Sequence, residues 1–103
     1  MITQPILING RWRAAQASGT FRAENPATGE NLPDVYPISG FSDCEAALDA
    51  ASQAATVLGE TPPETLAMFL EGYAQRIEAR AGELCATAHL ETGYPVSPRL
   101  ADV

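Results

Sequence analysis

The sequence predicts an α+β chain in which two N-terminal β-hairpins are followed by two or three packed α-helices. Two observations lead to this prediction. The N-terminal part alternates short β-prone runs with turn residues, and the composition then changes to alanine-rich segments with helical periodicity. The chain therefore divides into a hairpin segment, residues 1–41, and a helical segment, residues 42–103.

The first hairpin is predicted around Asn9 and Gly10. An Asn-Gly pair is the strongest two-residue hairpin signal, because both residues tolerate positive φ. It follows the β-prone run Ile6–Ile8 and precedes Arg11–Arg13, which is the predicted return strand. The small and polar residues 14–19 are predicted to form a loop.

The second hairpin is predicted to join strands over residues 20–24 and 30–36 through the turn Asn25–Gly29. The proline of this turn fixes φ at its second position, and the final glycine can adopt the left-handed conformation. Pro33 and Pro37 lack an amide donor, so they restrict the returning strand to an edge position.

The first helix is predicted to begin at Ser42, which forms a capping box with Glu45, and to end at Gly59. Small apolar residues recur behind the cap at helical spacing. They are Cys44, Ala47, Leu48, Ala51, Ala55 and Leu58. Because this face is mostly alanine, we expect it to lie very close to the element on which it packs.

A longer amphipathic stretch follows a second capping box, Thr61 with Glu64, which has proline in the first turn. Its apolar stripe consists of Leu66, Phe69, Leu70, Tyr73, Ala74, Ile77, Ala81, Leu84 and Ala88. Gly82 is a candidate point of division, which leaves two or three helices in all. Gly93 and Pro95 are predicted to end the stretch.

The chain is acidic: thirteen Asp and Glu face six Arg, there is no Lys, and the net charge is −7. Such a charge repels phosphate backbones and anionic lipids, so nucleic acid and membrane surfaces are not expected partners. No apolar run approaches the ~20 residues of a membrane span. The N-terminus has no signal-peptide features, which favours a cytoplasmic protein.

Cys44 and Cys85 are the nucleophile candidates. The N-terminus of a helix favours a thiolate at Cys44, but the flanking Asp43 and Glu45 disfavour one. Both cysteines lie on or beside an apolar stripe, so we interpret each as a small buried hydrophobe without a catalytic role.

A metal site is weakly indicated, because Cys85 and His89 lie four residues apart and face one side of a helix. Zinc needs three or four protein ligands, and no second Cys or His cluster accompanies the pair. His89 is therefore interpreted as a partly exposed helix residue. The chain also lacks a Gly-x-Gly-x-x-Gly turn, a phosphate loop and a pair of catalytic carboxylates. The residues alone thus indicate no catalytic, cofactor-binding or metal-binding position.

Three short phrases carry a resemblance. They are Leu-Ile-Asn-Gly-Arg-Trp at Leu7–Trp12, Asn-Pro-Ala-Thr-Gly-Glu at Asn25–Glu30, and Glu-Thr-Gly-Tyr-Pro at Glu91–Pro95. Each is weak alone, but their order and separation resemble the N-terminal end of the NAD(P)-dependent aldehyde dehydrogenase superfamily. The resemblance covers nearly the whole chain. It departs at Leu66, where the family usually has Arg, and at Tyr94, where Lys is common.

The resemblance implies a scaffold segment, with residues 1–41 and 42–103 both part of one incomplete aldehyde dehydrogenase domain. The family oxidises an aldehyde to a carboxylic acid with NAD or NADP. Its Cys nucleophile, Glu base, oxyanion-hole Asn and cofactor contacts all lie beyond this segment, so no residue here inherits those roles. The implied partners are the remainder of the fold and further copies in a homo-oligomer.

Within the superfamily the chain is most similar to bacterial α-ketoglutarate semialdehyde dehydrogenases. The rival hypothesis is a self-standing, non-catalytic helical interaction module without an enzymatic parent. The coding sequence beyond Val103 distinguishes the two, because an enzyme would continue into a Cys-bearing active-site phrase. The sequence leaves the aldehyde, the choice between NAD and NADP, and the oligomeric state open.

Overall fold

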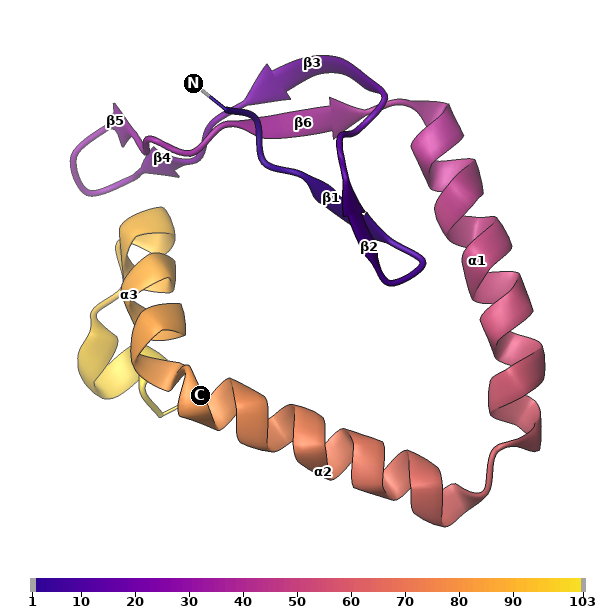
Figure 1. Ribbon diagram of the computed structural model, residues 1–103. Coiled ribbons are helices and arrows are strands. Elements are labelled where there is room, and N and C mark those ends of the chain that lie inside the picture. The colour runs from indigo at the N-terminus through magenta and orange to yellow at the C-terminus, as the bar shows by residue number, and fades with distance from the viewer. Residues whose placement is uncertain (1, 103) are drawn as a thin grey trace. The chain divides into compact units, whose positions relative to one another are not determined.

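The computed structural model describes residues 2–102, which form two compact units (Figure 1). Unit 1 comprises Met1–Ala23 and Pro33–Glu60, and unit 2 comprises Glu24–Leu32 and Thr61–Val103. Short antiparallel strand pairs occupy the N-terminal part, and three α-helices follow them. The predicted α+β class is confirmed.

The first hairpin of unit 1 is formed by β1 (Ile6–Ile8) and β2 (Arg11–Arg13), in which Leu7 lies opposite Trp12. Asn9 and Gly10 connect the strands with φ values of 53° and 74°. Both residues of the turn therefore adopt the positive φ that the Asn-Gly pair predicted. The Leu7–Trp12 pair projects from one face, and the two arginines of β2 project from the other.

The second strand pair of unit 1 joins β3 (Ala17–Phe21) to β6 (Tyr36–Ser39), which run side by side in Figure 1. The prediction of a loop over residues 14–19 is therefore wrong from residue 17 onward. Pairing with β6 overrides the weak β-propensity of the Ala-Ser-Gly run. The sheet has only these two strands, so Pro37 within β6 needs no second ladder partner.

Helix α1 (Phe41–Glu60) follows β6 and starts one residue before the predicted cap. The amide of Asp43 donates to the Gly40 carbonyl, so Ser42 lies inside the first turn and the predicted capping box with Glu45 is wrong. Gly59 is also helical, and the helix continues to Glu60. The two prolines that follow account for the end, because a residue before proline disfavours the α conformation.

Unit 1 packs a face of α1 that overlaps the predicted apolar stripe only at its edge, where Ala47 and Ala51 line a hollow with the first hairpin. Helix α1 contacts β1 and β6, and Asp43, Ala46 and Ala50 are its described residues that lose most exposure. Leu48 and Leu58 of the predicted stripe remain 66% and 53% exposed. The burial of Asp43 sets the rotation of the helix, as described below.

Unit 2 begins with β4 (Glu24–Asn25) and β5 (Glu30–Asn31), a two-stranded hairpin around the turn predicted at Asn25–Gly29. The Asn25 carbonyl accepts the amides of Thr28 and Gly29, and its side-chain oxygen accepts the amide of Ala27. The predicted second hairpin is thus two strand pairs, β4 with β5 in unit 2 and β3 with β6 in unit 1.

The helices of unit 2 are α2 (Pro63–Ala79) and α3 (Ala81–Thr92), followed by a short irregular turn, η1 (Val96–Leu100). The stretch divides at Arg80, two residues before the candidate Gly82, so residues 2–102 contain three α-helices. Pro62 occupies the N-cap position of α2, which places the predicted Thr61 cap one residue too early. The proline in the first turn is confirmed.

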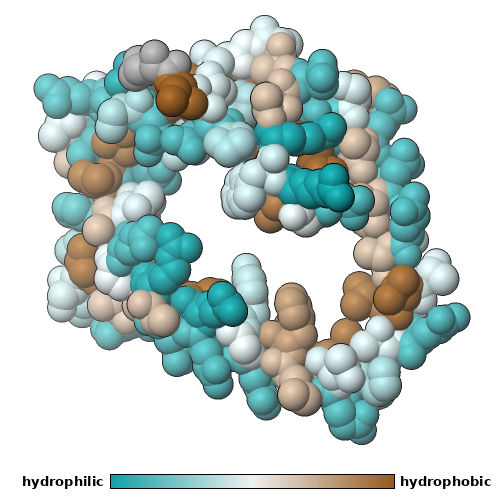
Figure 2. Space-filling model, viewed as in Figure 1, coloured by the Kyte–Doolittle hydropathy of each residue, from teal (hydrophilic) through white to brown (hydrophobic). Residues whose placement is uncertain are grey.

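Large apolar side chains remain on the surface, and no described one is fully buried. Hydrophobic residues, brown in Figure 2, lie among hydrophilic ones on the face shown. The stripe of α2 is one such surface, with Phe69, Leu70 and Tyr73 at 66%, 63% and 59% exposure. Among the described residues, no helix combines the length and apolar character needed to cross a membrane.

Candidate functional site

A buried carboxylate connects the N-terminal strands of unit 1 to α1. Asp43 is 3% exposed, and one of its oxygens accepts the backbone N–H of Gln16 at 2.8 Å. The other oxygen accepts a hydrogen bond from Arg13 Nη2 at 3.3 Å. Asp43 lies in the first turn of α1, where the positive end of the helix dipole also stabilises a carboxylate. This Asp43 cluster fixes the rotation of the helix.

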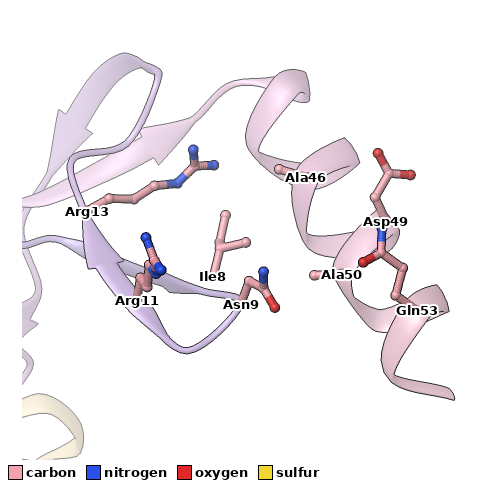
Figure 3. A pocket seen from close by; sticks show the side chains of 8 residues that line it. All are labelled: Ile8, Asn9, Arg11, Arg13, Ala46, Asp49, Ala50 and Gln53. Atoms are coloured by element: carbon pink, nitrogen blue, oxygen red, sulfur yellow. The ribbon is translucent and has the colours of Figure 1, made fainter. Parts of the chain in front are cut away.

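A hollow opens between the first hairpin and α1, with a volume of ≈ 350 Å³ (Figure 3). We call it the arginine-lined hollow, and its lining consists of Ile8, Asn9, Arg11, Arg13, Ala46, Asp49, Ala50 and Gln53. Arg11 and Arg13 are two residues apart on β2, so both side chains leave the same face of the strand. Ile8, Ala46 and Ala50 supply an apolar surface between the polar walls.

The two arginines of the hollow differ in their partners. Arg13 gives one donor to Asp43, whereas the Arg11 side chain makes no hydrogen bond or ion pair with a described residue. The Asp49 side chain, on the α1 side of the hollow, likewise has no such partner within residues 2–102. The hollow therefore offers one unmatched guanidinium and, across from it, one unmatched carboxylate.

In unit 2, two of the sequence phrases contact each other. A Cβ placed on Gly93 would lie 3.3 Å from the Pro26 side chain and 3.8 Å from the Ala27 amide nitrogen. Gly93 has φ of 73° and closes α3 by donating its amide to the His89 carbonyl. The Asn25–Glu30 turn is therefore seated against the end of α3, at a place where only glycine fits without strain.

The turn after α3 is closed by its own side chains. Thr92 Oγ1 donates to the Ala88 carbonyl at 2.6 Å and accepts the Tyr94 amide at 3.2 Å. His89 Nδ1–H donates to the Tyr94 carbonyl at 2.7 Å, and the Arg99 guanidinium lies 5.1 Å from the centre of the Tyr94 ring. His89 thus stabilises a helix end. Among the described residues, no group of three or more His, Cys, Asp or Glu is placed to hold a metal ion.

The two cysteines occupy different surroundings. Cys44 is exposed, which contradicts the prediction of a buried thiol, because the Asp43 cluster turns the neighbouring position outward. Cys85 is half-buried in an apolar groove of ≈ 490 Å³ on unit 2. This groove is lined by Ile77, Glu78, Ala81, Leu84, Cys85, Ala88, Leu100 and Ala101.

One exposed ion pair supports the start of α3. Arg80 donates through Nε and Nη2 to the two carboxylate oxygens of Glu83, at 3.1 and 2.6 Å. These hydrogen bonds, with the Arg80 charge in second place, lower the pKa of the Glu83 carboxyl below its ordinary value. The same contacts raise the pKa of Arg80. Both groups are exposed, so the pair is screened by solvent and salt.

The Asp43 cluster is not predicted from the sequence, in which Asp43 is only the neighbour of Cys44 and Arg13 only a residue of a predicted strand. Both partners of Asp43 lie at least 27 residues away in the chain, so no local pattern reports the contact. Arg11 and Arg13 at alternate strand positions were the one available signal of a shared polar face.

Known proteins that are similar to this chain are aldehyde dehydrogenases. The model of the aldehyde dehydrogenase family matches residues 12–103. A malonate-semialdehyde dehydrogenase of Bacillus pumilus is 33% identical over 96 residues, which is 93% of this chain and 20% of the relative. A probable aldehyde dehydrogenase of Mycobacterium tuberculosis is 36% identical over 94 residues, or 91% of this chain and 18% of the relative. A vanillin dehydrogenase of Pseudomonas fluorescens is 34% identical over 106 residues, with 98% and 22% covered. The chain thus spans about a fifth of the length of these curated relatives.

Proposed function

Because the chain belongs to the aldehyde dehydrogenase family, we propose that it is the N-terminal scaffold segment of an NAD(P)-dependent aldehyde dehydrogenase. In this proposal residues 1–41 and 42–103 form part of one incomplete domain. The whole enzyme oxidises an aldehyde to the carboxylic acid: water supplies the added oxygen, and a hydride passes to the nicotinamide. The relatives are named for several different aldehydes, which supports the reaction class. For the particular substrate we propose α-ketoglutarate semialdehyde, on the resemblance described above.

The uncovered apolar faces are the single observation that carries the scaffold role. The outer face of α1 presents Leu48 and Leu58, and the stripe of α2 presents Phe69, Leu70 and Tyr73, all more than half exposed. Apolar surface beyond a few hundred Å² on a monomer usually marks an interface. The remainder of the enzyme is the partner that we propose for both faces. The assembled enzyme is proposed to be cytoplasmic and homo-oligomeric.

We place the nucleophile and the cofactor contacts outside this segment, with no catalytic, cofactor-binding or metal-binding residue within it. The one described strand–turn–helix junction, β6 to α1, does not fit a pyrophosphate. It contains a single glycine, Gly40, and the Asp43 carboxylate already occupies the first turn of the helix, where it repels phosphate. Cys44 is flanked by Asp43 and Glu45, whose charges disfavour a thiolate, and Cys85 lies in a largely apolar groove beside Ala88. No described hydrogen bond joins either thiol to a carboxylate or an imidazole that could act as its base.

A graft tests the scaffold role. Residues 1–103 replace the matching N-terminal segment of the Bacillus pumilus malonate-semialdehyde dehydrogenase, and NADH or NADPH formation is measured with malonate semialdehyde. We expect the graft to turn over and a Leu70→Asp graft to fail, because the charge would be buried against the rest of the fold. Glu71→Gln, on the polar face of the same helix, is the matched control and should remain active. An inactive unmodified graft, or an active L70D graft, would contradict the scaffold role.

Measurements on the chain alone separate the scaffold from an independent module. We expect no aldehyde oxidation, and calorimetric titration with NAD and NADP should give dissociation constants weaker than ~100 μM, or about −5.5 kcal/mol. We also expect self-association or marginal folding, since the apolar faces lack their cover. A monodisperse monomer with a sharp, concentration-independent thermal transition would instead support the non-catalytic helical interaction module.

A further inference from the structure

We propose that the arginine-lined hollow of unit 1 binds the carboxylate of an acidic side chain presented by a protein segment. The proposal depends only on the hairpin, on α1 and on the space between them. It does not depend on the enzymatic role of the parent protein.

The cationic wall of the hollow has donors to spare. A guanidinium carries five N–H donors and binds a carboxylate through two parallel hydrogen bonds. Arg13 uses one Nη2 on Asp43, and the Arg11 side chain has no partner among the described residues. Figure 3 shows the Arg13 side chain extending from β2 toward α1, with Arg11 beside it on the same strand, and both line the hollow. Arg11 is therefore the main anchor, and the remaining donors of Arg13 lie beside it.

The charges of the hollow select an anion at Arg11. The Asp43 carboxylate is buried and already matched by Arg13 and the Gln16 amide, so its charge does not cancel that of Arg11. Two of the six arginines of this acidic chain gather in this one hollow. An acidic partner thus finds here a complementary patch on a chain whose net charge of −7 otherwise repels it.

The opposite wall favours a peptide over a free anion. Asp49 precedes Ala50 and so lies about 100° around α1 from it, toward the rim of the hollow. A carboxylate at the rim repels a second negative charge, but it accepts N–H groups, as the Gln53 amide oxygen also does. A peptide backbone supplies such N–H donors next to an acidic side chain, whereas a dicarboxylate brings only further negative charge.

The size of the hollow agrees with one anchored side chain. Its volume of ≈ 350 Å³ is at the lower end of the roughly 300–1,000 Å³ of ligand sites. Ile8, Ala46 and Ala50 offer an apolar surface for the methylene groups of a glutamate. This combination of cation, apolar surface and rim acceptors fits a glutamate with its flanking backbone.

The test follows arginine side-chain N–H signals by NMR in the graft described above, in which the rest of the fold covers the apolar faces. Isotope labelling confined to residues 1–103 leaves the six Nε–H signals of the segment's arginines to follow. The probes are acetyl-Gly-Glu-Gly-amide, the same peptide with Gln in place of Glu, and glutarate as a free dicarboxylate. We expect the Glu peptide to shift the Arg11 and Arg13 signals saturably, and the Gln peptide to leave them in place.

Two substitutions with equal charge change identify the anchor. Arg11→Gln removes a side chain without a described partner, so it should preserve the fold and weaken the Glu peptide by about tenfold or more. Arg76→Gln, on α2 in the other unit, is the matched control and should leave the affinity unchanged. Far-UV circular dichroism of both variants verifies that the helices are retained.

A third substitution separates the two sources of carboxylate. Asp49→Asn should strengthen glutarate relative to the Glu peptide, because it removes the repulsion at the rim. Tighter binding of glutarate than of the Glu peptide to the unmodified graft would overturn the assignment to a protein segment. Equal shifts with the Gln peptide, or unaltered binding by R11Q, would overturn the carboxylate site altogether.

Discussion

Replacement of Asp43 by alanine should lower the free energy of unfolding of unit 1, because Asp43 joins the N-terminal strands to α1. The substitution removes the acceptor of the Gln16 N–H and of the Arg13 guanidinium together. It leaves a backbone donor next to the first turn of α1 without its partner. The hairpin end of unit 1 would then lose its polar connection to the helix.

The magnitude follows from the two hydrogen bonds. A hydrogen bond to a charged group contributes about 1.5–3 kcal/mol when buried, and the 2.8 Å bond from Gln16 is the shorter and better shielded of the two. Arg13 is 44% exposed, so its bond is screened by water and adds only about 0.5 kcal/mol. Release of a buried carboxylate offsets part of this loss. We expect a net decrease of about 2 kcal/mol in the free energy of unfolding.

Urea unfolding at low protein concentration, followed by Trp12 fluorescence and circular dichroism, measures this decrease. The matched control is Asp49→Ala, which removes the same charge from an exposed position of the same helix and should stay within about 0.5 kcal/mol of the parent chain. Hydrogen exchange at the Gln16 amide gives a local measure, and 2 kcal/mol corresponds to roughly thirtyfold faster exchange. If D43A and D49A unfold at the same urea concentration, or if the Gln16 amide exchanges at an unaltered rate, the Asp43 cluster does not hold the unit together.

Three further outcomes follow from the structure. Cys44→Ala should change the free energy of unfolding by less than about 0.5 kcal/mol, because Cys44 is exposed. Cys85→Ala should lower it by up to about 2 kcal/mol, because Cys85 is half-buried. In the graft, neither substitution should lower kcat by more than about tenfold. Gly93→Ala should lower the free energy of unfolding by about 1–2 kcal/mol because of its left-handed backbone, and further because the new Cβ would lie 3.3 Å from Pro26. Gly29 has nearly the same φ and no neighbour within 4 Å, so thermal unfolding of Gly29→Ala measures the backbone contribution alone. An NMR titration should give the Glu83 carboxyl a pKa below the ordinary value of glutamate, and Arg80→Gln should raise that pKa. The stabilisation from the Arg80–Glu83 pair is present above the pKa of Glu83 in the unfolded chain. It is lost as the pH falls through the lower pKa of the folded chain.

Local chemistry explains which parts of the fold the sequence predicts correctly. The Asn9-Gly10 turn, the Asn25–Gly29 turn and the Gly93 helix end all depend on residues that are adjacent in the chain. Their backbone preferences are strong enough to hold in any context. The first hairpin, the second turn and the end of α3 were therefore placed correctly.

Contacts between distant residues explain the errors. The strand Ala17–Phe21 exists because β6 lies beside it, and no property of the Ala-Ser-Gly run indicates this. The packed face of α1 is set by Asp43, whose partners lie in the N-terminal strands and the loop after them. The hydropathy pattern predicts that α1 packs through its stripe of alanine and leucine, but the leucines of that stripe, Leu48 and Leu58, remain exposed. A charged residue at the start of a helix is usually exposed to solvent, so helical periodicity does not predict that Asp43 is buried.

The phrases that identify the family owe their recognisability to backbone conformation and packing. The Asn25–Glu30 turn and the Glu91–Pro95 phrase meet through Pro26 and Gly93, although more than sixty residues separate them. Each glycine of these phrases is required by a positive φ, and Gly93 also by the close approach of a neighbouring proline. Such requirements hold as long as the backbone keeps its shape. The most recognisable residues of this segment are therefore determined by backbone conformation and packing.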